Sequence, residues 1–167
     1  MKTDDIYKSS RHQKIIGDFG EHLICNWLSR SGVEVTRVDH TGVDIIAYDS
    51  ETGKRIGIAV TSRTRNVGKE KESVNFLHKK DRKKLDDACE AFGCEPWIGV
   101  YVETSHFADL YLTSLRNYEE KYRGKIRTID AWKMGSEYER RYSRDPEVKH
   151  VRFQFDTVGW DWKPKSG

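Results

Sequence analysis

The sequence predicts an α/β domain with a mixed central β-sheet flanked by helices. Two observations support this fold class: an amphipathic helical stretch precedes three short β-rich stretches, and a second helical stretch precedes a further apolar strand. Tight turns join the first three strands, which predicts antiparallel hairpins and excludes an all-parallel nucleotide-binding sheet. A length of 167 residues suffices for one core, so residues 1–167 are expected to form a single domain.

The first helix is expected over residues 12–30, and Gly32 follows it as the expected C-cap. Apolar and small side chains recur there every three or four residues and therefore share one stripe. The stripe contains Ile16, Gly17, Phe19, Gly20, Leu23, Ile24, Trp27 and Leu28. Glu21 lies at the border of this stripe, from which its carboxylate can reach across the edge of the sheet.

The remaining elements are predicted from β-rich runs, turn residues and helix formers. Strands are expected at residues 33–38, 43–48, 55–63, 96–103, 108–113 and 151–155, and further helices at residues 74–92 and 115–123. A Gly-bearing turn at residues 39–42 precedes the second strand. Asp44 is therefore held at the start of that strand, partly exposed and suited to a hard divalent cation, although such an Asp often merely caps its turn.

Composition excludes several classes of protein. The chain is 34% charged and 11% aromatic, and this aromatic content is unlike that of a disordered chain. No stretch approaches the ~18 apolar residues of a membrane span, and no signal peptide is expected. The three cysteines form no CxxC pair and the histidines show no spacing typical of zinc ligands. A soluble, cytoplasmic protein is therefore expected.

Positive charge is concentrated in one segment of the chain. The net charge is only +3, yet residues 63–84 contain nine Lys or Arg and three acids. Such a segment is commonly a solvated helix face with its preceding loop. It also fits contact with the phosphates of a nucleic acid.

Three runs of residues are informative as a set. They are Gly17-Asp18-Phe19-Gly20-Glu21, Gly42-Val43-Asp44-Ile45-Ile46-Ala47 and Ile58-Ala59-Val60-Thr61-Ser62-Arg63. In order and spacing they resemble the core of the PD-(D/E)XK nuclease superfamily, in particular the archaeal Holliday-junction resolvases. The resemblance implies a restriction-endonuclease-like core at about residues 12–113, followed by a C-terminal extension at about residues 114–167.

The resemblance further implies a metal-dependent endodeoxyribonuclease that binds DNA, and for which a homodimer is to be considered. Glu21 and Asp44 match the two acids that hold the metal in this family, Mg²⁺ or Mn²⁺. The metal activates water and neutralises charge on the scissile phosphate. The family's Glu-x-Lys on the third strand is not matched, because Ala59 and Thr61 stand at its two positions. Efficient cleavage by the usual arrangement is therefore not expected.

Groups elsewhere in the sequence are candidates to replace the missing ones. Arg63 lies two residues beyond Thr61 on the same strand face and offers a substitute cation, better suited to binding phosphate than to acting as a base. Further candidates lie in the polar loop and at the end of the fourth strand. They are Lys69, Glu70, Lys71, Glu72 and Glu103.

In the nuclease family, the end of the third strand and the helix after it border the groove that holds the DNA backbone. Phosphate contacts are therefore predicted for Arg63, Arg65, Lys79, Lys80, Lys83 and Lys84. Readout of base sequence is not predicted. The C-terminal aromatic residues are predicted to form a second hydrophobic cluster rather than a platform for stacked bases. They are Trp132, Tyr138, Tyr142, Trp160 and Trp162.

The sequence leaves three functions open. The first is a catalytically degenerate or weak protein of the nuclease fold that binds DNA, including branched or distorted DNA, through its backbone. The second is an active metal-dependent endonuclease, resolvase-like or restriction-like, with relocated catalytic groups. The third is a protein-interaction module on a pseudonuclease fold, with the aromatic C-terminal part as its contact surface.

Overall fold

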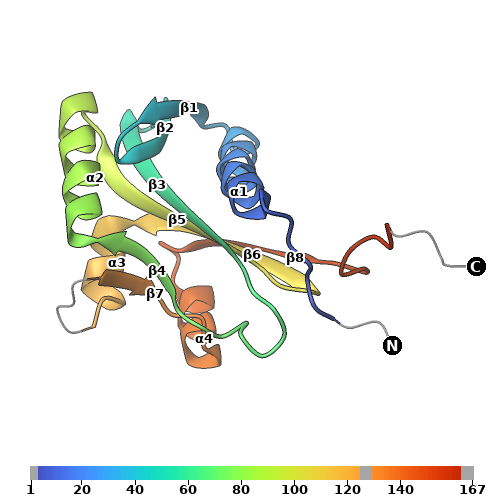
Figure 1. Cartoon of the computed structure of the whole chain (residues 1–167). Coiled ribbons are helices and arrows are strands. Elements are labelled where there is room, and N and C mark those ends of the chain that lie inside the picture. The colour runs from blue at the N-terminus through green and yellow to red at the C-terminus, as the bar shows by residue number, and fades with distance from the viewer. Residues whose placement is uncertain (1–3, 125–128, 163–167) are drawn as a thin grey trace, which may run out of the picture.

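A computed structural model describes residues 4–124 and 129–162. Within them, a six-stranded sheet has the order β1-β2-β3-β5-β6-β8, and β4 and β7 form a separate two-stranded sheet (Figure 1). The large sheet contains β1 (Glu34–His40), β2 (Val43–Asp49), β3 (Lys54–Thr64), β5 (Glu95–Glu103), β6 (Phe107–Ser114) and β8 (Lys149–Gln154). The small sheet contains β4 (Val74–His78) and β7 (Ile129–Trp132).

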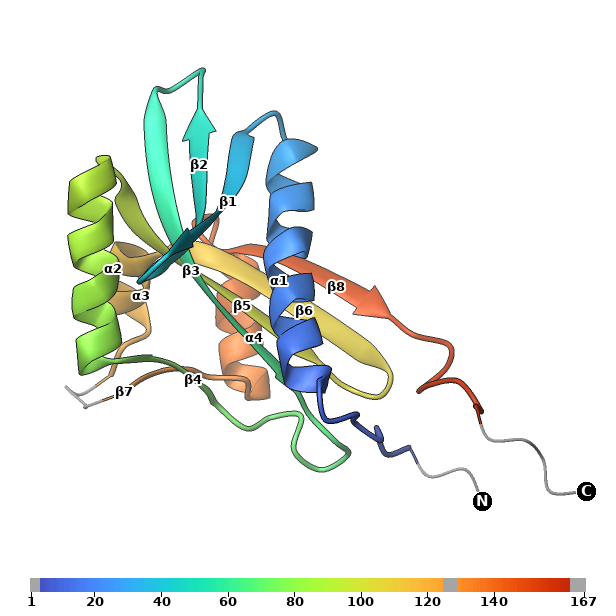
Figure 2. The same cartoon turned by 45° about the horizontal axis from the view of Figure 1, so that its top comes forward.

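Helices cover both faces of the large sheet. Helix α1 (His12–Ser29) lies on one face, while α2 (Lys79–Phe92), α3 (Leu115–Lys121) and α4 (Ser136–Arg144) lie with the small sheet on the other (Figures 1 and 2). Two hydrophobic clusters fill the two interfaces. The predicted fold class is confirmed. No helix in the described parts of the chain is long and apolar enough to cross a membrane.

The strand directions agree with the predicted hairpins. Strands β1, β2 and β3 are antiparallel neighbours, β5 joins β3 in parallel after the α2 crossover, and β6 and β8 add antiparallel pairs. The sheet is therefore mixed. The parallel pairing brings the carboxyl ends of β3 and β5 to the same edge of the sheet.

The buried face of α1 follows the predicted stripe. Ile16, Gly20, Ile24 and Leu28 are buried, whereas Phe19 retains 46% exposure. A Cβ at position 20 would collide with the side chain of a serine on β3, so a glycine is needed for the helix to pack this closely on the sheet. This close packing places the next residue of the helix at the edge of the sheet, where the sequence predicted it.

The predicted helix over residues 74–92 is wrong at its start. Residues 74–78 form strand β4, and α2 begins at Lys79. Val74 and Leu77 are buried, and β4 pairs antiparallel with β7. Val74 and Phe76 favour a strand over a helix, and pairing with β7, which lies far along the chain, stabilises that strand.

The C-terminal aromatic residues divide into two sets. Trp132 of β7 and Tyr142 of α4 stack with ring centroids 4.1 Å apart, and Tyr138 packs against the same core cluster. The predicted hydrophobic cluster is confirmed for these three, although β7 and α4 themselves were not predicted. It is wrong for Trp160 and Trp162, which are 84% and 85% exposed. They lie beyond the last strand, where the chain leaves the sheet (Figure 1).

Candidate functional site

Asp44 is held in place by the turn before it and by β3 beside it. Gly42 has φ +95°, and a Cβ there would collide with the backbone of Lys84, so the turn packs directly on α2. Pairing of β2 with β3 starts at Ile45. Immediately before it, Asp44 Oδ2 accepts a hydrogen bond from the backbone N–H of Val60 at 2.8 Å. The carboxylate thus accepts the hydrogen bond that a backbone carbonyl of β2 would accept if the pairing with β3 continued.

The environment of Asp44 raises its pKa. Burial raises the pKa of Asp44 above its usual range, and the carboxylate of Glu21 raises it further. The hydrogen bond from Val60 and the positive charge of Arg37 lower this pKa without outweighing burial. A partly buried acid with a raised pKa beside a second acid is typical of a functional site.

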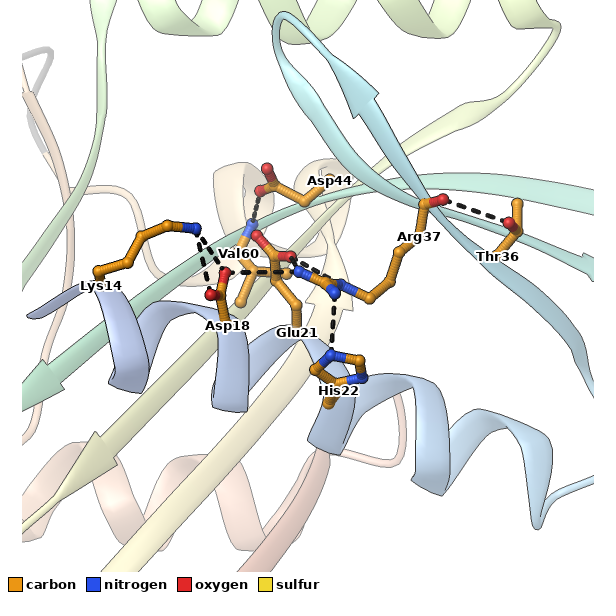
Figure 3. A network of polar contacts seen from close by, with 8 residues as sticks. All are labelled: Lys14, Asp18, Glu21, His22, Thr36, Arg37, Asp44 and Val60. Atoms are coloured by element: carbon orange, nitrogen blue, oxygen red, sulfur yellow. Dashed lines mark hydrogen bonds and ion pairs between the residues drawn. The ribbon is translucent and has the colours of Figure 1, made fainter. Parts of the chain in front are cut away.

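Arg37 of β1 joins the acidic side chains of α1 (Figure 3). Its Nε and Nη2 donate to Glu21 Oε2 at 3.0 and 2.6 Å, and Nη2 lies 3.5 Å from Asp18 Oδ1. Its Nη1 lies 2.8 Å from His22 Nε2. The hydrogen bond to Glu21 raises the pKa of Arg37 above its usual value. The sequence prediction did not include Arg37, because an arginine on an edge strand gives no local signal of the carboxylate that it will meet.

Two positions on β3 are those where the nuclease resemblance expects Glu and Lys. Ala59 packs against the hydrophobic cluster on the α2 side, whereas Val60 packs on the α1 side. By strand alternation Thr61 shares the face of Ala59. Neither side chain offers Asp44 a carboxylate or a cation. Within the described chain, Asp44 and Glu21 therefore lie near each other without the carboxylate and the cation that the resemblance expects at these two positions.

The side chain of Arg63 turns toward β4. Its Nη1 donates to the carbonyl of Ser62 at 2.8 Å and its Nη2 to the carbonyl of Asn75 at 3.4 Å. Burial lowers the pKa of Arg63, and the charge of Arg65 lowers it further. These contacts tie Arg63 to β4 rather than to Asp44, so its role as a substitute cation stays a prediction.

Three of the other candidate replacements have contacts of their own. Glu70 accepts a backbone hydrogen bond within its own loop at 2.9 Å, and Lys71 donates to Ser136 at 2.9 Å. Glu103, at the end of β5, contacts His12 and Thr64 at 3.2 and 3.0 Å. These contacts occupy all three side chains, and none of them involves Asp44 or Glu21.

The donor set around Asp44 does not fit Mg²⁺ or Mn²⁺. These ions prefer several oxygen ligands in a nearly octahedral arrangement. Asp44 and Glu21 each have one oxygen committed to a protein donor, and Arg37 adds a fixed positive charge beside Glu21. In the described ranges 4–124 and 129–162, no group of three or more His, Cys, Asp or Glu side chains is arranged to hold a metal ion. We therefore assign no reaction step to a metal.

The predicted DNA-contacting lysines lie mainly at the start of α2. Lys79, Lys80 and Lys83 line one surface depression together with His78. Lys83 pairs with Asp87 at 2.6 Å. Lys79 and Lys80 have no ion pair or side-chain hydrogen bond within the described part of the chain. The depression therefore contains two lysines whose charge is not balanced by a neighbouring acid.

Two other predicted contacts have acidic neighbours. Lys84 lies 3.7 Å from Asp81. Arg65 lies 4.0 Å from Glu72 and donates to the carbonyl of Ser73 at 3.3 Å. Their charges are less available to a ligand than those of the two unpaired lysines.

The chain was compared with known proteins. No family model and no curated protein matches it. Among solved structures, the chain is similar to Hjc of Archaeoglobus fulgidus, a Holliday junction resolvase from an archaeal hyperthermophile. The sequences are 14% identical, and the match covers 70% of this chain and 88% of that chain with a TM-score of 0.49. The PD-(D/E)XK relationship therefore remains a resemblance of motifs and element order.

Proposed function

We propose that this protein binds DNA through the phosphate backbone and does not cleave it by means of a carboxylate-bound metal. The observation that supports binding most directly is the depression lined by His78, Lys79, Lys80 and Lys83. Neighbouring positive charges without acidic partners repel one another, so an anionic ligand stabilises them. The regularly spaced phosphates of a nucleic acid are such a ligand.

The position of the unpaired lysines in α2 supports the same proposal. Lys79 and Lys80 are the first two residues of the helix, where the helix dipole disfavours cations and favours anions. No side chain caps this end of α2. A phosphate there would meet free backbone N–H groups as well as the two ammonium groups. Phosphate contacts of Arg63 and Arg65, near the other end of β4, stay predictions, because both side chains donate to backbone carbonyls there.

The absence of metal-dependent cleavage is proposed from the carboxylate site. A single group that stabilises charge in a transition state contributes about 10²–10³ in rate. Ala59 and Thr61 replace two such groups, and Arg37 occupies an oxygen of Glu21. A homodimer and a preference for branched DNA stay predictions from the resemblance.

Fluorescence anisotropy with a labelled four-way junction and a labelled linear duplex, over a series of salt concentrations, tests the binding. The variant is Lys79→Ala/Lys80→Ala. We expect its affinity to fall about tenfold, and the slope of log K against log salt to decrease by about 2, because each lost phosphate contact contributes about 0.9.

The matched control is Arg116→Ala/Lys149→Ala, which removes the same charge from two exposed positions on α3 and β8. We expect this control to bind almost as tightly as the unaltered protein. An equal loss in both variants would attribute binding to net charge alone. Binding that does not depend on salt would contradict backbone contact.

Cleavage is tested separately on plasmid, linear and junction DNA with Mg²⁺ or Mn²⁺. We expect no product from the unaltered protein or from Asp44→Ala. Cleavage that Asp44→Ala abolishes would establish the active endonuclease with relocated groups and overturn this part of the proposal.

A further inference from the structure

The carboxylate site contains a positive charge of its own. We propose that Arg37 is an internal counter-cation, which gives Glu21 and Asp44 the charge balance that a divalent metal would otherwise supply. The site is then independent of metal because of a residue on β1, in addition to the residues missing from β3. This inference rests on the proposed function only in treating the two acids as one site, and its test uses no nucleic acid.

The contacts of Arg37 match this role. Two of its nitrogens donate to the same oxygen, Glu21 Oε2, at 3.0 and 2.6 Å, which is a charge-assisted interaction. The guanidinium also reaches Asp18 at 3.5 Å, and its positive charge lowers the pKa of the partly buried Asp44. Arg37 therefore contacts two carboxylates of α1, and Asp44 of β2 lies nearby (Figure 3).

The same charge opposes a metal ion at this place. A divalent ion bound to Glu21 would lie within a few ångströms of the guanidinium that contacts the same side chain. At about 4 Å, repulsion between charges of +2 and +1 weakens binding by at least about tenfold, even with the dielectric constant of water. Ala59 occupies the position on β3 where the nuclease resemblance expects a further carboxylate. Removal of Arg37 would thus both free an oxygen of Glu21 and remove a repelling charge.

We expect replacement of Arg37 to leave the fold intact, which makes the inference testable. Its side chain is 37% exposed and that of Glu21 is 21% exposed. Ion pairs that are open to solvent contribute little to stability. The hydrogen bonds of the β1–β2 ladder come from the backbone and do not depend on this side chain.

Titration with Mn²⁺, followed by calorimetry and by the magnetic resonance signal of the free ion, tests the proposal. We expect the unaltered protein to bind Mn²⁺ only weakly at this site. The variant Arg37→Ala is expected to bind Mn²⁺ at least about tenfold more tightly. The double variant Arg37→Ala/Glu21→Gln is expected to lose this gain, because it lacks the freed carboxylate.

Arg37→Lys is the matched control, since it keeps the charge and loses the paired hydrogen bonds. We expect it to bind Mn²⁺ no better than the unaltered protein. The proposal is overturned if the unaltered protein binds Mn²⁺ through Glu21 as tightly as Arg37→Ala does, or if a folded Arg37→Ala gains nothing. If Arg37→Ala does not fold, Arg37→Gln decides in the same way. DNA binding by the unaltered protein is measured independently, so failure here leaves the proposed binding untouched.

Discussion

Two networks in this protein pair an arginine with a carboxylate, one around Arg37 and one around Arg152. In the second, Arg152 of β8 donates to both oxygens of Asp109 on β6 at 2.8 and 3.0 Å, and His150 contacts the same carboxylate at 2.7 Å. Asp109 is 1% exposed. Glu21, the main partner of Arg37, is 21% exposed. The two networks therefore use similar groups at different depths.

The contrast extends to the buried Asp109 and the partly buried Asp44. Burial by itself would raise the pKa of Asp109, yet the hydrogen bonds of His150 and Arg152 hold it below the usual range. Asp44 receives one backbone hydrogen bond, and burial prevails. A carboxylate that serves the fold is surrounded by donors. Asp44 accepts one hydrogen bond, from the Val60 N–H, so its charge is less compensated than that of Asp109.

The largest expected effect comes from breaking the buried network. Arg152→Gln leaves the carboxylate of Asp109 in the interior without its cation, which we expect to lower the free energy of unfolding by about 3 kcal/mol. Urea unfolding followed by tryptophan fluorescence measures the change. A loss below about 1 kcal/mol would mean that His150 alone satisfies Asp109, and the contrast between the networks would largely disappear.

The same substitution in the exposed network serves as the matched comparison. We expect Arg37→Gln to lower the free energy of unfolding by less than about 1 kcal/mol, because the pair with Glu21 is open to solvent. The same urea experiment measures it. A loss as large as that of Arg152→Gln would show that Arg37 serves chiefly to hold α1 against β1.

The smallest expected effect has the opposite sign and depends on pH. The pKa of Asp44 is raised in the folded protein, so ionisation of this group opposes folding once the pH exceeds the unfolded value of about 3.9. Asp44→Asn keeps an oxygen for the Val60 N–H and removes this cost. We expect the variant to be slightly more stable at pH 7, by less than about 1 kcal/mol, with the difference vanishing near pH 4.

Unfolding of Asp44→Asn at the two pH values, beside the unaltered protein, provides the measurement. Asp109→Asn is the control, and we expect it to lower the stability at pH 7 instead of raising it. The lowered pKa of Asp109 stabilises the fold above pH about 4, and this stabilisation is lost as the pH falls through the folded pKa. A variant at position 44 that is less stable at pH 7 would contradict the raised pKa and would assign Asp44 a structural role.

Several features follow from the sequence by itself. The apolar stripe of α1, the hairpin turns and the glycine before Asp44 record local geometry, because helix periodicity, strand alternation and positive φ each demand particular residue types at close spacing. That Ala59 and Thr61 stand where the nuclease resemblance expects Glu and Lys is likewise visible without a structure. These features predicted the fold class and marked Glu21 and Asp44 as one candidate site.

Other features were decided only by the tertiary structure. Residues 74–78 became a strand because β7 lies beside them, and Arg37 became part of the carboxylate site because β1 folds back along α1. Trp160 and Trp162 stayed exposed while Trp132 entered the core. In each case the deciding partner is distant in the sequence. The local sequence pattern restricts the backbone conformation of a residue and the face on which its side chain lies. The partner of that side chain depends on how the whole chain packs.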